Sequence, residues 1–168
     1  MGLFGPSKVK TTPHDFVKTQ LDKIFSADFV DAEQAGFANL SREIPILQKV
    51  SPDKYLKERQ DVVYSLFQLA WDRTIPYDVF VKYSLIMLDD PRVKEINSGV
   101  YHRCLSRAQE AGMDTFGFIS RLFISQIVPE SVGISEADYS QLYVMYGTNF
   151  TDLYRSFEAL IKQHKFLT

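Results

Sequence analysis

The side chains that most often do chemistry in proteins are few in this chain, and their spacing does not suit a site. The three histidines are His14, His102 and His164, and none has a second histidine or a glutamate at the spacing that helical metal sites use. His102 and Cys104 are two residues apart, so on a helix they would point about 200° away from each other. The sequence therefore predicts no metal site and no cofactor.

Two further arrangements could support catalysis, and each has a structural explanation. Cys104, the single cysteine, lies within a predicted helix and not at a helix N-terminus, where the dipole would activate a thiol. Asp89 and Asp90 are adjacent carboxylates, but Asp90 precedes Pro91 and is expected to cap the helix that begins there. We therefore assign no catalytic residue and expect a non-catalytic protein.

The charge of the chain points to no particular partner. Nineteen basic residues stand against 21 acidic ones, and the net charge of −2 is spread without a block of one sign, which argues against nucleic acid as a partner. No apolar run approaches the ~18 residues of a membrane span, and the first residues lack the apolar core of a signal peptide. We expect a soluble protein of the cytoplasm or of another intracellular compartment.

The aromatic content, 14% of the residues, is the unusual feature of the composition. Tyr139, Tyr143, Tyr146 and Tyr154 share one face of a C-terminal helical segment. A buried tyrosine needs a partner for its hydroxyl, whereas at a protein interface the ring can be buried and the hydroxyl can stay wet. These four tyrosines, together with Trp71, are the predicted partner-binding residues, and packing at the edge of the domain's own core is the alternative.

The elements that would position these residues are all predicted to be helices. Residues able to cap a helix, each followed by proline, occur at Thr12, Ser51 and Asp90, and apolar residues recur at helical spacing between them. The expected helices cover approximately residues 13–25, 29–44, 52–74, 76–89, 91–112, 115–128 and 136–165. Residues 76–89 are apolar on nearly every side and are predicted to form a central, buried helix. Gly147 leaves open whether residues 136–165 form one helix or two, and no strand is predicted.

The fold class that follows is all-α, a compact bundle of seven or eight helices. Residues 1–12 are predicted to be a mobile N-terminal arm, and residues 13–168 to be a single domain. The alternative is a short stack of HEAT-like two-helix repeats, because Pro13, Pro52 and Pro91 are evenly spaced.

The absence of a chemical motif favours a protein that holds another molecule. The first hypothesis is a helical protein-interaction module, such as an adaptor, an assembly subunit or an inhibitor, whose partner is another protein or a second copy of the chain. The alternative hypothesis is a helical bundle that encloses an apolar ligand such as a lipid or a pigment, lined by residues 76–89 and 115–128.

Overall fold

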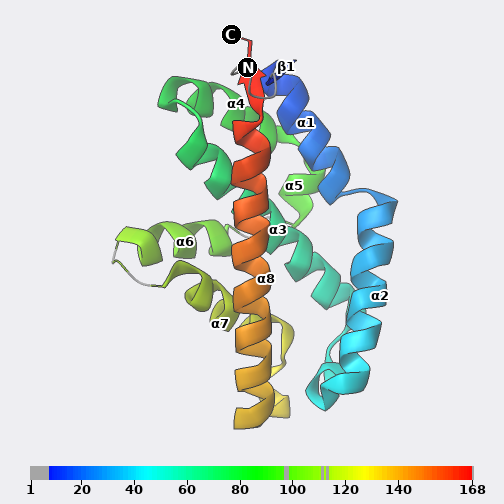
Figure 1. Ribbon diagram of the computed structural model, residues 1–168. Helices are drawn as coiled ribbons and strands as arrows, with labels where there is room; N and C mark the ends of the chain where they lie inside the picture. Colours follow the sequence, from blue (N-terminus) through cyan, green and yellow to red (C-terminus); the bar gives the residue numbers. More distant parts are fainter. Residues whose placement is uncertain (1–7, 97–98, 111, 113, 168) are drawn as a thin grey trace, which may run out of the picture.

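A computed structural model describes residues 8–96, 99–110, 112 and 114–167. The described chain folds into eight α-helices, two short 3-10 helices and two three-residue strands, which confirms the predicted all-α bundle (Figure 1). The α-helices are α1 (Pro13–Ile24), α2 (Ala27–Glu43), α3 (Pro52–Thr74), α4 (Tyr77–Asp89), α5 (Pro91–Ile96), α6 (Val100–Glu110), α7 (Thr115–Ile127) and α8 (Glu136–Lys162). The short elements are β1 (Val9–Thr11), η1 (Pro45–Lys49), η2 (Glu130–Val132) and β2 (His164–Phe166).

Helix α3 forms the centre of the bundle. It contacts all seven other α-helices, and every residue from Asp61 to Trp71 is buried. Its start follows the predicted signature, because the Ser51 hydroxyl accepts a hydrogen bond from the backbone N–H of Lys54 at 3.4 Å and Pro52 occupies the first turn. A helix surrounded in this way differs from the units of a solenoid, each of which contacts only its neighbours. The structure is therefore the bundle and not the HEAT-like stack.

Helix α8 is a single helix that runs along the whole molecule, beside α3 and across the direction of α6 and α7 (Figure 1). Gly147 lies inside it with helical backbone, and the Thr151 hydroxyl donates to the Gly147 carbonyl at 2.7 Å. The question that the sequence left open is thus decided in favour of one helix. The structure still has eight α-helices, because the single helix predicted for residues 91–112 is two helices, α5 and α6. The division lies near Gly99, whose φ of 66° is left-handed.

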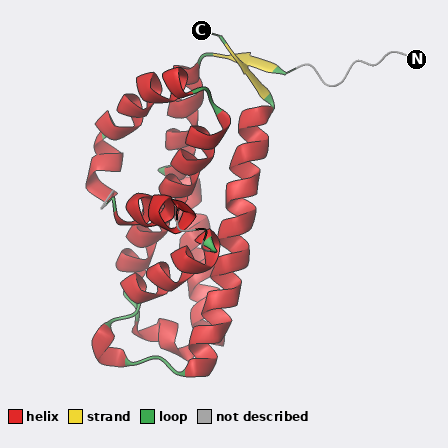
Figure 2. Cartoon of the chain, turned by 90° about the vertical axis from the view of Figure 1, so that its left-hand side faces the viewer, coloured by secondary structure: helices red, strands yellow, loops and turns green. Residues whose placement is uncertain are grey.

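The two strands were not predicted, and they join the ends of the chain. Val9 pairs with His164 and Thr11 pairs with Phe166 in a parallel ladder, close to the end of α8 (Figure 2). Residues 9–11 of the predicted N-terminal arm are therefore held in this ladder, while residues 1–7 lie outside the described residues.

The predicted cap residues mostly have the expected role. The side chains of Thr12 and Ser51 each accept a backbone N–H at the start of a helix, as predicted, and the side chains of Asp114 and Ser135 do the same for α7 and α8. In α2 the N-cap is Ser26, and Asp28 lies in the first turn of the helix.

The prediction that residues 76–89 form a central helix was wrong. Helix α4 lies at the side of the bundle, against α1, α3 and α5, and only Ser84 and Met87 are fully buried in it. Its neighbours cover one face, and the opposite face has no covering element among the described residues. The central position belongs to α3, which has contacts on all its sides.

Candidate functional site

Three of the five predicted partner-binding residues lie in the protein's own core. Trp71 is completely buried and stacks on Phe16 of α1, with 5.5 Å between the ring centroids. Tyr146 is 3% exposed and packs edge-on against Phe123 of α7. Tyr154 is 6% exposed. In this fold these three side chains pack within the bundle, and little of their surface is exposed.

The polar contacts of Tyr154 are made within the chain. Its hydroxyl accepts from Arg73 at 3.3 Å and donates to Glu158 at 2.8 Å. Burial raises the pKa of this phenol and the hydrogen bond from Arg73 opposes the rise. The hydroxyl therefore has the internal partners that a buried tyrosine needs.

The other two predicted residues, Tyr139 and Tyr143, remain partly exposed at the beginning of α8. Their rings stack on each other with 6.3 Å between centroids, and the Arg121 guanidinium lies 5.4 Å from the Tyr143 centroid. A Cβ atom at Gly117 would collide with the Tyr143 hydroxyl, so glycine at this position lets the ring approach α7. These contacts form a tyrosine ridge, defined here as Tyr139 and Tyr143, over the surface of α7.

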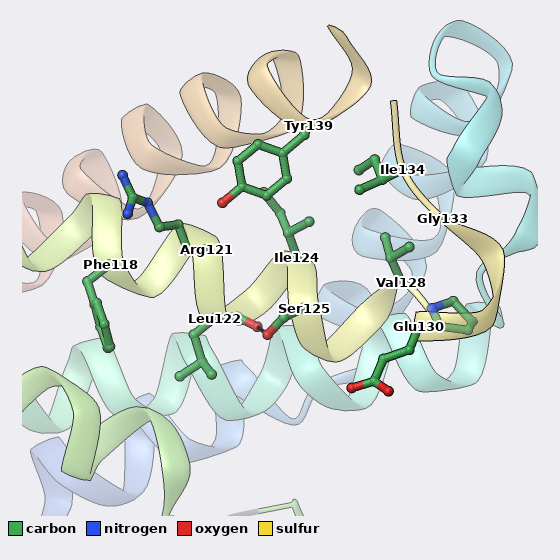
Figure 3. Close-up of a pocket in the computed structure, with 11 residues that line it drawn as sticks. Phe118, Arg121, Leu122, Ile124, Ser125, Val128, Glu130, Gly133, Ile134 and Tyr139 are labelled. Carbon is green, nitrogen blue, oxygen red and sulfur yellow. Dashed lines mark hydrogen bonds between the residues drawn. The ribbon is translucent and has the colours of Figure 1, made fainter. Parts of the chain in front are cut away.

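An apolar groove lies on the Tyr139 side of the ridge (Figure 3). Its volume is about 510 Å³, and its walls come from α7, η2, the loop after η2 and the start of α8. The apolar part of the wall consists of Phe118, Leu122, Ile124, Val128, Ile134 and Tyr139. Pro129, which ends the α7 segment, and Gly133, whose φ of 64° only glycine adopts readily, turn the chain beside the groove.

The two charged residues of the groove lie at opposite ends of it, as Figure 3 shows for Arg121 and Glu130. Both side chains are exposed, and neither forms an ion pair with another residue in the described part of the chain. The Tyr139 hydroxyl is on the side of Arg121. The groove is thus an apolar channel with a cation at one end and an anion at the other.

A second, more polar hollow lies on the Tyr143 side of the ridge. It has a volume of about 360 Å³ and is lined by Asp114, Phe116, Tyr143, Val144, Asp152 and Arg155, among others. Val144 is 65% exposed although it is a β-branched apolar residue. The ridge and the two hollows form one continuous surface of α7 and the first half of α8, which we call the α7–α8 surface.

Sequence reasoning missed a second exposed apolar face, on α4. Tyr77, Val81, Leu85 and Leu88 are 77%, 45%, 61% and 43% exposed. Their spacing of four, four and three residues places them on one side of the helix, which is a signal that the sequence does contain. The sequence could not show which side is covered, because α4 also carries apolar residues on its other sides.

The residues considered for catalysis have structural partners. Asp90 accepts hydrogen bonds from the backbone and side chain of Arg92, which hold the pKa of its carboxyl below the usual value. Asp89 pairs with Lys94 at 3.2 Å. Burial lowers the pKa of His102. Among the residues that the structure describes, no group of three or more histidine, cysteine, aspartate or glutamate side chains could hold a metal ion.

None of the helices within residues 8–96, 99–110 and 114–167 combines the length and the apolar character that crossing a membrane requires. The lining of the apolar groove bears on the ligand hypothesis. The apolar groove is lined by α7 but by no residue of α4, so the two segments named for a ligand cavity do not meet there.

Comparison of the chain with profiles of known protein families, with curated protein sequences and with solved structures gives no significant match.

Proposed function

We propose that this protein is a non-catalytic helical interaction module that binds another protein through the α7–α8 surface. The observation that carries the proposal is the apolar groove beside the tyrosine ridge. A well-formed apolar hollow that carries a few polar groups at its edge is the usual form of a binding site. Partly exposed tyrosines beside such a hollow have the character of interface anchors.

The geometry also indicates the chemistry of the partner segment. A segment that fits the groove would place large apolar side chains between two charges, an acidic one near Arg121 and a basic one near Glu130. Because the cation and the anion lie at opposite ends, only one direction of the segment satisfies both. The bound segment would thus be apolar in its middle and would have a fixed orientation.

The experiment is a comparison of native and denatured masses for the protein purified from its source. Ser125 is exposed and lines the groove, so Ser125→Arg would fill the groove with a charged side chain without removing a core contact. Ser156→Arg is the matched control, since Ser156 is exposed on α8 and lines neither hollow. We expect a co-purifying polypeptide with the wild type and the control, and its loss with Ser125→Arg.

A polypeptide that Ser125→Arg retains as well as the wild type would contradict the proposal. A native mass of two copies of this chain, reduced to one copy by Ser125→Arg, would show that the α7–α8 surface binds a second copy of the chain and not a different protein. Tyr139→Ser provides a second variant, and it should weaken retention while leaving the melting temperature close to that of the wild type.

A second candidate function is binding of an apolar small molecule, and the volume of the groove favours it. About 510 Å³ lies within the range of ~300–1,000 Å³ that small-molecule sites occupy. Added mass of a few hundred daltons in the native measurement, released on denaturation and absent from Ser125→Arg, would support this function instead of the protein interaction.

A further inference from the structure

Helix α4 gathers most of the large apolar side chains that the described part of the chain leaves exposed. Four of the seven lie on it, namely Tyr77, Val81, Leu85 and Leu88, which we call the α4 face. Single exposed apolar residues are ordinary, but a group on one side of one helix is typical of an interaction site. Figure 1 shows α4 near the end of the bundle that holds the strands, whereas α8 begins at the other end. A molecule bound to the α4 face would therefore leave the α7–α8 surface free.

Two charged residues flank Leu85 on its side of the helix. Lys82 precedes Leu85 by three residues and Asp89 follows it by four, and these spacings place the three side chains on one face. Lys82 is exposed and forms no ion pair in the described part of the chain, although its ammonium lies 5.2 Å from the Tyr83 ring centroid. Asp89 pairs with Lys94 at 3.2 Å, but both side chains are exposed, and such a contact contributes little and can be exchanged.

This order of charges is complementary to itself when it is reversed. We consider two copies of α4 that pack antiparallel, with a twofold axis at the midpoint between Lys82 and Asp89. Lys82 of each copy then lies opposite Asp89 of the other, so the ion contact is made twice. Leu85 meets its counterpart at the axis, and Val81 lies beside Leu88 of the other copy.

Other arrangements of the two helices lose this complementarity. A parallel pair about a twofold axis would place Lys82 against Lys82 and Asp89 against Asp89. An antiparallel pair centred on Tyr83 would bring Asp78 of one copy beside Asp89 of the other. Like charges in contact are unfavourable, so the charges on α4 select the first arrangement.

We propose that the α4 face binds a second copy of this chain, as an antiparallel α4–α4 pair with Leu85 at the twofold axis. Both copies use the same face, so association stops at two chains. One face of a 13-residue helix offers less surface than the ~800 Å² that each partner contributes to a standard interface. We therefore expect a Kd on the order of 100 µM and a monomer at low-micromolar concentration.

Sedimentation equilibrium of the purified full chain tests the proposal, at concentrations from about 10 µM to about 1 mM, on either side of the expected Kd. The average mass should rise from one chain toward two and no further. A mass of one chain at the highest concentration would overturn the proposal. Growth beyond two chains would also overturn it, because a contact that uses the same face of both copies cannot extend.

Leu85→Glu tests the position of the contact. Leu85 is 61% exposed and glutamate is a good helix former, so the melting temperature should stay that of the wild type. Two negative charges would meet at the axis, and the Kd should rise about tenfold or more. Val144→Glu is the matched control, since Val144 is 65% exposed on α8, and it should dimerise as the wild type does. A dimer that Leu85→Glu retains and Val144→Glu loses would place the contact on the α7–α8 surface and contradict the proposal.

An exchange of charges tests the antiparallel pairing. Lys82→Glu and Asp89→Lys each place like charges opposite one another, and each should weaken the dimer about fivefold. The double variant, Lys82→Glu with Asp89→Lys, reverses both charges and should recover the wild-type Kd. Lys57→Glu, at an exposed lysine of α3, makes the same change in net charge as Lys82→Glu and should leave the dimer unchanged. A double variant as weak as the single ones would overturn the antiparallel pairing.

Discussion

Helices α3 and α4 follow each other in the chain and have opposite positions in the fold. Helix α3 contains many charged residues, yet its residues 61–71 are all buried. Helix α4 contains few polar residues, yet its side chains Tyr77 and Leu85 are strongly exposed. The more apolar helix is thus the peripheral one.

The difference shows that burial depends on the neighbours of a helix and not only on its own residues. Helix α3 has 23 residues, enough to contact all the other α-helices in turn, whereas α4 has 13 and packs mainly against α1, α3 and α5. Buried polar groups in α3 are accommodated by partners, as Arg59 is by Glu33 and Asn149. Apolar residues in α4 that find no neighbour remain on the surface.

The largest effect is expected at Trp71 of α3. Its ring lies between Phe16 of α1 and Phe166 of β2, so its removal would leave a cavity where three elements meet. Trp71→Ala should lower the free energy of unfolding by about 3–5 kcal/mol, measured by urea denaturation. Lys57→Ala, at an exposed position of the same helix, is the control. A loss below about 1 kcal/mol would mean that the centre of the bundle is not at Trp71.

Alkaline pH should lower the free energy of unfolding, by less than Trp71→Ala does. Burial raises the pKa of Tyr64 in α3 and of Tyr101, which donates to Glu58 of α3 at 2.7 Å. Because the folded state holds these phenolic protons more tightly than the unfolded chain, the stability they contribute is complete below the unfolded pKa of 10.0 and is lost as the pH rises above it. Each such proton contributes a slope of about 1.4 kcal/mol per pH unit.

Urea denaturation from neutral pH to above pH 10 would measure this slope, with Tyr101→Phe as the comparison. The variant should lose the contribution of one proton from the slope above pH 10. An identical slope in the two proteins would show that the Tyr101 phenol is not held in its neutral form by the fold.

The smallest effect is expected on the exposed face of α4. Leu85 is 61% exposed, so Leu85→Gln should change the free energy of unfolding by no more than about 0.5 kcal/mol. Met87→Ala in the same helix is the contrast, because Met87 is completely buried and its truncation should cost about 2–5 kcal/mol. Similar losses for the two variants, in the same denaturation experiment, would show that the outer face of α4 is covered in solution.

The helix starts could be predicted from the sequence because capping is local. Thr12, Ser51 and Ser135 each bond to a backbone N–H three residues ahead, a contact that needs no tertiary structure. The strands could not be predicted, since each has three residues and Val9 pairs with His164 at the far end of the chain. Three residues are too few to show alternation.

The candidate site was predicted in part. The shared face of Tyr139, Tyr143, Tyr146 and Tyr154 follows from helical spacing. The exposure of these tyrosines does not follow from helical spacing. Tyr146 and Tyr154 lie where other helices cover α8, while Tyr139 and Tyr143 lie at the beginning of α8, over α7. The groove beside them consists of residues from three elements, and no periodicity within one segment could have indicated it.

The sequence by itself determined the all-α class, most of the helix boundaries and the apolar face of each helix, because these depend on interactions between residues a few positions apart. Only the tertiary structure decided that α3 is central and α4 peripheral, that Arg59 meets Glu33 and Asn149, and that two tyrosines of the predicted four remain at the surface. Those outcomes depend on which helices pack together, and packing joins residues far apart in the chain whose relation no local pattern records.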